Sequence, residues 1–190
     1  MGKINLIVVF LVLLFCFPRS VSASVKEAGA SASVMPKNVK SFSNQIDEDT
    51  NIKRKVIREV LTNYNSPLSV ETDAFVDTCT KYDIDCYLLP SIAGLESTFG
   101  KNILGDSFNP FGWGGGTIYF KSWADGIDQV GAGLSQNYIA KGADTIEKMG
   151  PIYAASPTWS VRVRFFHNEF KRVEAEKQLY FSKLAVELKP

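Results

Sequence analysis

The sequence predicts a mainly helical domain that carries one small β-hairpin lobe. Apolar residues recur at steps of three and four over most of the chain after about residue 50, a pattern typical of amphipathic helices. Residues 108–121 break this pattern, because glycines are followed there by side chains that favour strands. A hydrophobic content of 45% in 190 residues is enough for a core and excludes a wholly disordered chain.

The first 23 residues are typical of a secretory signal peptide. Lys3 precedes an apolar run over residues 4–17, and small residues end at Ala23. A retained membrane anchor is the alternative, but the run is shorter than the roughly 20 residues that a span needs. We therefore expect a secreted or extracytoplasmic protein without membrane contact after cleavage. Residues 24–49, rich in Ser, Ala, Val and Lys, are expected to form a flexible spacer.

The domain itself is predicted over residues 50–175, with residues 176–190 as a helical extension or tail. Helices are expected over residues 52–64, 69–82 and 86–99, and again from Ser122, from Asp144 and from Ser156 onward. The hairpin is placed between about residues 111 and 121, where Ile118, Tyr119 and Phe120 have β character.

Charge and cysteine content exclude several classes of function. The 21 Lys and Arg against 20 Asp and Glu leave no basic excess for nucleic acid or an anionic membrane. One His and three Cys without a C-x-x-C pair build no zinc cage and no haem attachment motif, so neither metal nor cofactor is expected. Cys79 and Cys86 could form a disulfide or remain buried thiols. We expect a monomer.

Glu96 is the first candidate for chemistry, because it lies at the border of an apolar helical stripe. The stripe consists of Leu88, Ile92, Leu95 and Phe99. Partial burial favours the protonated form of a carboxyl, and a glycosidase uses such an acid to protonate its leaving oxygen. An ordinary boundary glutamate would occupy the same position, so position alone leaves both interpretations open.

Aromatic side chains concentrate in and around the Gly-rich segment. Six fall within the 16 residues from Phe108 to Trp123. Flat rings flanked by amide groups suit a sugar, whose faces are apolar and whose rim is polar. Packing of these rings into the core is the alternative, since aromatic residues dominate core burial.

Three motifs then occur in order. Residues 92–101 contain a Glu-Ser pair followed closely by Gly-Lys, residues 109–113 read Asn-Pro-Phe-Gly-Trp, and residues 153–159 read Tyr-Ala-Ala-Ser-Pro-Thr-Trp. Together they resemble the bacterial peptidoglycan N-acetylglucosaminidases, the glycoside hydrolase family 73 type of the lysozyme-like superfamily. The resemblance covers about residues 66–172 and implies an α+β lysozyme-like fold. The chain departs from the family at Ser156, usually Asp, and at Trp159, usually Tyr.

By this resemblance, Glu96 is the general acid, Tyr153 is an active-site tyrosine, and the substrate is peptidoglycan or another glycan that contains N-acetylglucosamine. The candidate substrate-binding residues are Asn109, Phe111, Gly112, Trp113 and Trp159. Family members often use a second acid on the β-lobe, for which Asp106 is the nearest candidate here, although a solvated loop residue would occupy the same position. Without a second carboxylate, the acetamido group of the sugar could act as an internal nucleophile.

Three other functions remain open at this point. A lytic transglycosylase shares the Glu-Ser helix, although Asn-Pro-Phe-Gly-Trp stands where such enzymes commonly carry Gly-Leu-Met-Gln. A non-catalytic lysozyme-like module would bind glycans without using Glu96. Endo-β-N-acetylglucosaminidases that act on mannosyl glycoproteins carry the same family motifs.

Overall fold

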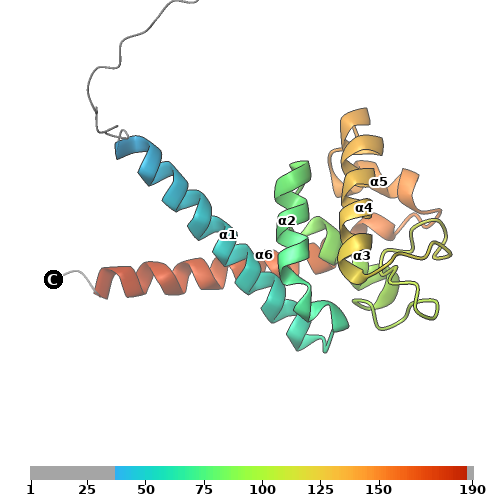
Figure 1. The fold of residues 1–190 in the computed structure, drawn as a ribbon, viewed down its shortest axis with the longest axis horizontal. Coiled ribbons are helices and arrows are strands. Elements are labelled where there is room, and N and C mark those ends of the chain that lie inside the picture. Colours follow the sequence, from blue (N-terminus) through green and yellow to red (C-terminus); the bar gives the residue numbers. More distant parts are fainter. Residues whose placement is uncertain (1–36, 188–190) are drawn as a thin grey trace, which may run out of the picture. The chain divides into compact units, whose positions relative to one another are not determined.

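The computed structural model of the chain describes residues 37–187, and these residues form a mainly helical domain, as predicted (Figure 1). Six α-helices and two short 3₁₀ helices follow one another in this part of the chain: α1 (Lys37–Asn63), η1 (Pro67–Val70), α2 (Thr72–Tyr82), α3 (Leu88–Ser97), α4 (Trp123–Asn137), η2 (Ile139–Lys141), α5 (Ile146–Tyr153) and α6 (Trp159–Glu187). The predicted signal peptide and residues 24–36 of the predicted spacer lie outside the described residues.

Helix α1 begins earlier than the sequence pattern indicates. It includes residues 37–49, for which the composition predicts a flexible spacer. These residues contain neither Pro nor Gly, so nothing in the backbone prevents the helix from extending upstream of the apolar stripe. Asp49 and Lys53 form an ion pair one turn apart on this helix.

Helix α6 runs through residue 175 to Glu187 without a break. Its second half packs against α1, where Lys177 pairs with Glu59 and the Lys55 ammonium lies 4.5 Å from the centre of the Phe181 ring. The first and the last described helices therefore contact each other (Figure 1).

Helix α3 lies in the core, because it packs against α6 along its length. Ile92 and Ala93 are completely buried. A Cβ atom at Gly94 would lie 2.8 Å from the Phe99 ring and 3.0 Å from Phe166 of α6. This close approach of α6 to the α3 backbone brings the start of α6 next to the carboxyl end of α3.

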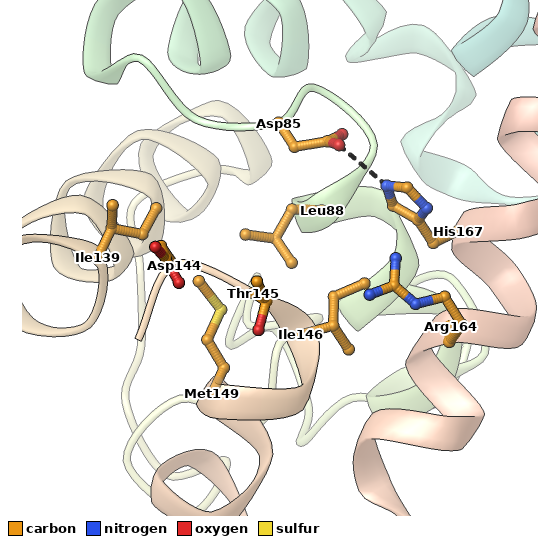
Figure 2. Close-up of a pocket in the computed structure, with 9 residues that line it drawn as sticks. All are labelled: Asp85, Leu88, Ile139, Asp144, Thr145, Ile146, Met149, Arg164 and His167. Atoms are coloured by element: carbon orange, nitrogen blue, oxygen red, sulfur yellow. Dashed lines mark hydrogen bonds and ion pairs between the residues drawn. The ribbon is translucent and has the colours of Figure 1, made fainter. Parts of the chain in front are cut away.

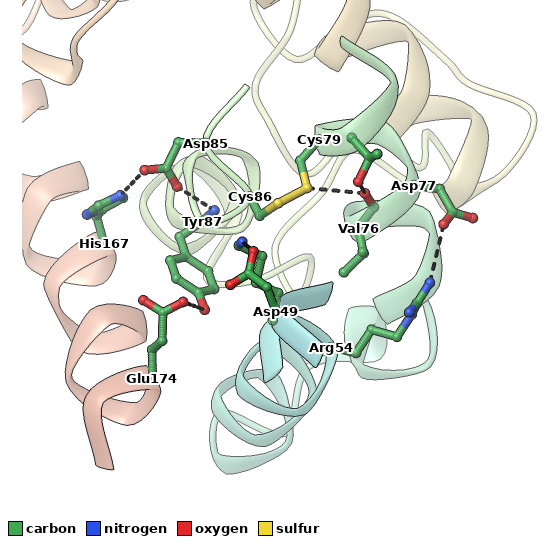
Figure 3. The surroundings of a disulfide bond; sticks show 12 residues. Asp49, Arg54, Val76, Asp77, Cys79, Asp85, Cys86, Tyr87, His167 and Glu174 are labelled. Carbon is green, nitrogen blue, oxygen red and sulfur yellow. Dashed lines mark hydrogen bonds and ion pairs between the residues drawn. A yellow bond between two sulfur atoms is a disulfide. The ribbon is translucent and has the colours of Figure 1, made fainter. Parts of the chain in front are cut away.

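A disulfide and a polar network fix the segment that leads into α3 (Figure 3). Cys79 and Cys86 are joined, which decides between the two alternatives that the sequence leaves open. Asp85 contacts His167 at 3.0 Å, and the Tyr87 hydroxyl donates to Glu174 at 2.8 Å. Burial, together with the Glu174 carboxylate, raises the pKa of the Tyr87 phenol.

The predicted β-hairpin is not formed. Residues 107–121 are turns and extended backbone, and no strand occurs within residues 37–187. Gly112, Gly114, Gly115 and Gly116 all have positive φ angles, which repeatedly turn the chain and prevent a regular ladder. One bond, from the Phe120 N–H to the Ser107 carbonyl, closes the base of this loop at 2.9 Å.

Candidate active site

The end of helix α3 determines where Glu96 lies. The helix stops after Ser97 because Thr98, Phe99 and Gly100 all adopt left-handed conformations, with φ of 53°, 58° and 82°. Two of these are not glycines, and such a conformation costs free energy that surrounding contacts must offset. Complete burial of the Phe99 ring and a bond from the Ser66 hydroxyl to the Phe99 carbonyl provide those contacts.

Ser97, the second residue of the Glu-Ser pair, connects this helix end to the glycine loop. Its hydroxyl lies 2.8 Å from the Pro110 carbonyl and 3.1 Å from the Ala93 carbonyl, and it accepts the Gly100 N–H at 2.8 Å. The side chain is buried, so these bonds are not exchanged for water. The loop is thereby held beside Glu96.

The two carboxylate oxygens of Glu96 have different surroundings. Oε1 accepts a hydrogen bond of 2.7 Å from the indole Nε1 of Trp159. Oε2 faces Gly112 so closely that a Cβ atom at that position would lie 2.9 Å away. The side chain as a whole is exposed, and within residues 37–187 it forms no ion pair.

An open groove of about 510 Å³ lies next to this carboxylate. One side consists of Glu96, Ser97 and residues 102–104, and the other of Asn109, Gly112, Gly115 and Gly116. Glu96 is the one carboxylate among these lining residues. Leu104, which is 55% exposed, gives the groove an apolar edge.

Tyr153 lies close to Glu96 but does not line the groove. Its ring stacks on Trp159, with centroids 4.7 Å apart, and its hydroxyl donates to the Phe111 carbonyl at 2.7 Å. Burial, and to a lesser extent the Glu96 and Tyr138 side chains, raise the pKa of Tyr153 well above 10. Tyr153 is therefore a neutral phenol that ties the end of α5 to the loop.

The five candidate substrate-binding residues separate into two groups. Gly112 and Asn109 line the groove. Asn109, however, is 3% exposed, and its amide bonds the Trp113 N–H and the carbonyls of Trp113 and Ile118. It shapes the loop and has little capacity left for a ligand.

The other three candidates are packing residues. Phe111 and Trp159 are buried, so their rings offer no face to a sugar. Trp113, which we expected to face the groove, is half-buried and lies against Gly133 of α4 and the ring of Tyr153. The core-packing interpretation of the aromatic segment therefore describes Phe111 and much of Trp113, whereas Tyr119 is 61% exposed. Within residues 101–121, the large apolar side chains that are exposed are Leu104, Ile118 and Tyr119.

Asp106, the candidate second acid, is exposed and is not among the residues that line the groove. No sequence pattern pointed to residues 102–104, which follow the Gly-Lys pair and form one wall of the groove. Their role depends on the left-handed turn at the end of α3, which carries no characteristic residue pattern beyond Gly100.

A second cavity, of about 170 Å³, lies between α3, α5 and α6 (Figure 2). His167 and Arg164 both project from α6 on one side of it, and Asp85 contacts His167. Its charges are satisfied within the protein, because Asp85 contacts His167, Asp144 contacts Lys148 at 2.6 Å, and Arg164 forms a bidentate pair with Glu147. We therefore take the groove beside Glu96 as the candidate active site.

In the part of the chain that the structure describes, no group of His, Cys, Asp and Glu side chains could hold a metal ion. None of the helices in that part combines the length and the apolar character needed to cross a membrane. Comparison of the chain with protein-family models and with curated proteins returned no match.

Proposed function

We propose that the chain is an exported glycoside hydrolase that cleaves β-1,4 linkages at N-acetylglucosamine in peptidoglycan, with Glu96 as the general acid and a lysozyme-like fold of the family 73 type. One observation carries this proposal. Glu96 is the single carboxylate that lines the groove, and its Oε2 reaches the groove because Gly112 has no side chain.

The shape and polarity of the groove support a glycan as the ligand. It is open to solvent, as a site for part of a polymer must be. Leu104 offers an apolar edge for the face of a sugar ring, and the Asn102 side chain and the loop backbone offer polar groups for its rim. The disulfide between Cys79 and Cys86 suits the oxidising surroundings of an exported protein.

The proposed reaction begins with proton transfer from Glu96 to the glycosidic oxygen while the bond from that oxygen to C1 breaks. No second carboxylate lines the groove, so the nucleophile is the acetamido oxygen of the sugar that carries C1. This oxygen attacks C1 and forms a cyclic oxazolinium intermediate. Water then adds to C1, opens this ring and returns a proton to Glu96.

The single carboxylate also favours a second candidate function, a lytic transglycosylase. In that reaction Glu96 protonates the leaving oxygen and then accepts a proton from the sugar's own 6-hydroxyl, which attacks C1 and gives an anhydro product. Mass analysis of the product ends distinguishes the two outcomes, because hydrolysis adds one water and ring closure adds none.

Glu96→Gln tests the proposal. The amide keeps the size and the bond from Trp159 but has no acidic proton, so release of reducing ends from purified peptidoglycan should fall by about 10²- to 10⁴-fold. Thermal melting should be unchanged, since the side chain is exposed. Asp106→Asn, measured in parallel, should retain activity.

Glu169→Gln is the matched control. Glu169 also accepts one bond from a neutral aromatic donor, the Tyr64 hydroxyl at 2.6 Å, but it does not line the groove. A Glu96→Gln protein that melts normally and keeps near-full activity would refute the proposal. Binding of glycan by the wild type without any turnover would instead indicate a non-catalytic module.

A further inference from the structure

We infer that Trp159 is a positioning residue that determines which oxygen of Glu96 carries the catalytic proton. The inference rests on the proposed function and adds a residue to it. The indole nitrogen of tryptophan can donate a hydrogen bond but cannot accept one. Its partner, Oε1 of Glu96, must therefore be an acceptor in every protonation state in which the 2.7 Å bond persists.

The position of the Trp159 indole is fixed by its packing. The residue is 2% exposed, and its ring stacks on Tyr153 at 4.7 Å with an interplanar angle of 26°. Tyr153 is in turn held by its bond to the Phe111 carbonyl. A Cβ atom at Gly150 would be in contact with the Trp159 ring at 3.5 Å, so α5 closes on it from another side. The indole N–H thus points at Glu96 without freedom to turn away.

The consequence for the protonated acid is geometric. A carboxylic acid has one carbonyl oxygen, which is the stronger acceptor, and one hydroxyl oxygen, which donates its hydrogen and accepts only weakly. Because the fixed Trp159 N–H is best matched by a carbonyl oxygen at Oε1, the form with the proton on Oε2 is favoured. Oε2 is the oxygen beside Gly112, on the groove. Trp159 thereby directs the acidic hydrogen toward the bound glycan and away from the protein interior.

Trp159→Phe tests this role, because it keeps an aromatic ring and removes the N–H. We expect kcat on peptidoglycan to fall about ten- to hundredfold, with KM nearly unchanged, since the lost bond is made to an ionisable group and not to substrate. Trp123→Phe is the control. Trp123 is a partly buried tryptophan of α4 that packs on Phe108, and it does not line the groove.

Comparing two substrates with different leaving groups distinguishes a loss of proton placement from a general disturbance of the structure. An aryl glycoside of N-acetylglucosamine with a 4-nitrophenol leaving group needs little protonation, whereas the sugar hydroxyl of peptidoglycan needs full protonation. The Trp159→Phe deficit should therefore be large on peptidoglycan and small on the aryl glycoside. Trp159→Tyr, which offers another donor, should recover part of the lost kcat and provides a second variant if the phenylalanine protein melts early.

Two results would overturn the inference. One is a kcat of Trp159→Phe on peptidoglycan equal to that of the wild type. The other is an equal loss on both substrates, which would indicate disturbed packing. If either result is found and the Glu96→Gln protein is inactive, the inference about Trp159 is wrong but the proposed function still holds. If the Glu96→Gln protein is fully active, both the inference and the proposed function are wrong.

Discussion

The groove beside Glu96 and the smaller cavity beside Asp85 each contain a carboxylate that contacts a residue of helix α6, but the two carboxylates have opposite surroundings. In the cavity, Asp85 contacts His167, and its second oxygen accepts the Tyr87 N–H at 2.8 Å (Figure 3). In the groove, Glu96 receives one bond from a neutral indole, and its other oxygen faces a glycine. A carboxylate that is fully bonded stabilises the fold, whereas one with a free oxygen at a groove is available for proton transfer.

His167 follows the pattern of Asp85. An ionised Asp85 can only accept, so Nε2 of His167 donates to it. Nδ1 is buried and has no partner among the described residues. This side of α6 is therefore structural, and changes to it should affect stability more than activity.

Among variants that keep both carboxylates, the largest effect is expected on the groove side, from Gly112→Ala. The new Cβ would lie 2.9 Å from Oε2, and it must displace the Glu96 carboxylate or the loop. A displacement of this kind costs about a hundredfold in rate. The positive φ of 64° adds backbone strain. The measurement is peptidoglycan turnover at a temperature well below melting.

Gly142→Ala is the control that separates backbone strain from the clash with Glu96. Gly142 has φ of 92°, and a Cβ atom at this position would have no neighbouring atom within 4 Å. This variant therefore carries strain without a clash, and it lies outside the groove. It should lose stability but keep its turnover. Equal turnover in both alanine variants would contradict the close contact between Gly112 and Glu96.

The next effect concerns the disulfide beside the cavity. Replacing both Cys79 and Cys86 by Ala should lower the free energy of unfolding by roughly 2–3 kcal/mol, the chain-entropy value for so short a loop. Turnover per folded molecule should not change, because neither residue lines the groove. Wild-type protein in reducing agent should melt like the double variant. A loss of turnover in folded double variant would show that the two regions are coupled.

A smaller effect is expected at the rim of the groove. Tyr119 is 61% exposed, and its hydroxyl would lie 3.8 Å from a Cβ atom at Gly105, next to the lining residue Leu104. Tyr119→Ala should weaken sedimentation with peptidoglycan by several-fold, up to about tenfold, and leave melting unchanged. Tyr180→Ala, which removes a 63% exposed ring from α6, is the control. Identical binding by the two variants would exclude Tyr119 from the glycan path.

The smallest effect is a change in pH dependence at Asp85. Burial alone would raise the pKa of this carboxyl, but the His167 contact and the Tyr87 N–H outweigh burial and hold its pKa below the usual 3.8. The stability it contributes is therefore fully present above about pH 4 and is lost as the pH falls through the lowered pKa. Asp85→Asn should melt below the wild type at pH 6, and the difference should shrink below about pH 3. A difference independent of pH would contradict this linkage.

Much of the fold was predictable because the apolar residues that recur at helical spacing in the sequence are mostly the residues that are buried in the structure. The spacing of α6 predicts an apolar stripe of Trp159, Val163, Phe166, Phe170 and Val173, and all of these are buried except Phe166, which is partly buried. The Ser122 hydroxyl caps α4 by accepting the Asp125 N–H at 3.1 Å, as the capping pattern predicts. The cap of α5 lies one residue later than predicted. Thr145 caps that helix, and Asp144 pairs with Lys148 instead.

The glycine loop was less predictable, because its conformation depends on contacts that no local pattern encodes. Asn109 forms three bonds to the backbone of its own loop, and these replace the hairpin ladder that the β-favouring residues suggest. The site was predictable only in part for the same reason. The motif pointed to Glu96, but the bond from Trp159 joins residues 63 positions apart and depends on how α6 packs on α3.

The contact of α1 with α6 has a consequence for the order of events during synthesis. The ribosome releases α1 first, but its partner residues Lys177 and Phe181 emerge near the end of the chain. Glu96 likewise remains without its indole donor until Trp159 has emerged. The disulfide, in contrast, joins cysteines seven positions apart and can close while most of the chain is still being made. Nascent chains that stop before α6 should therefore be unable to complete either the core or the groove.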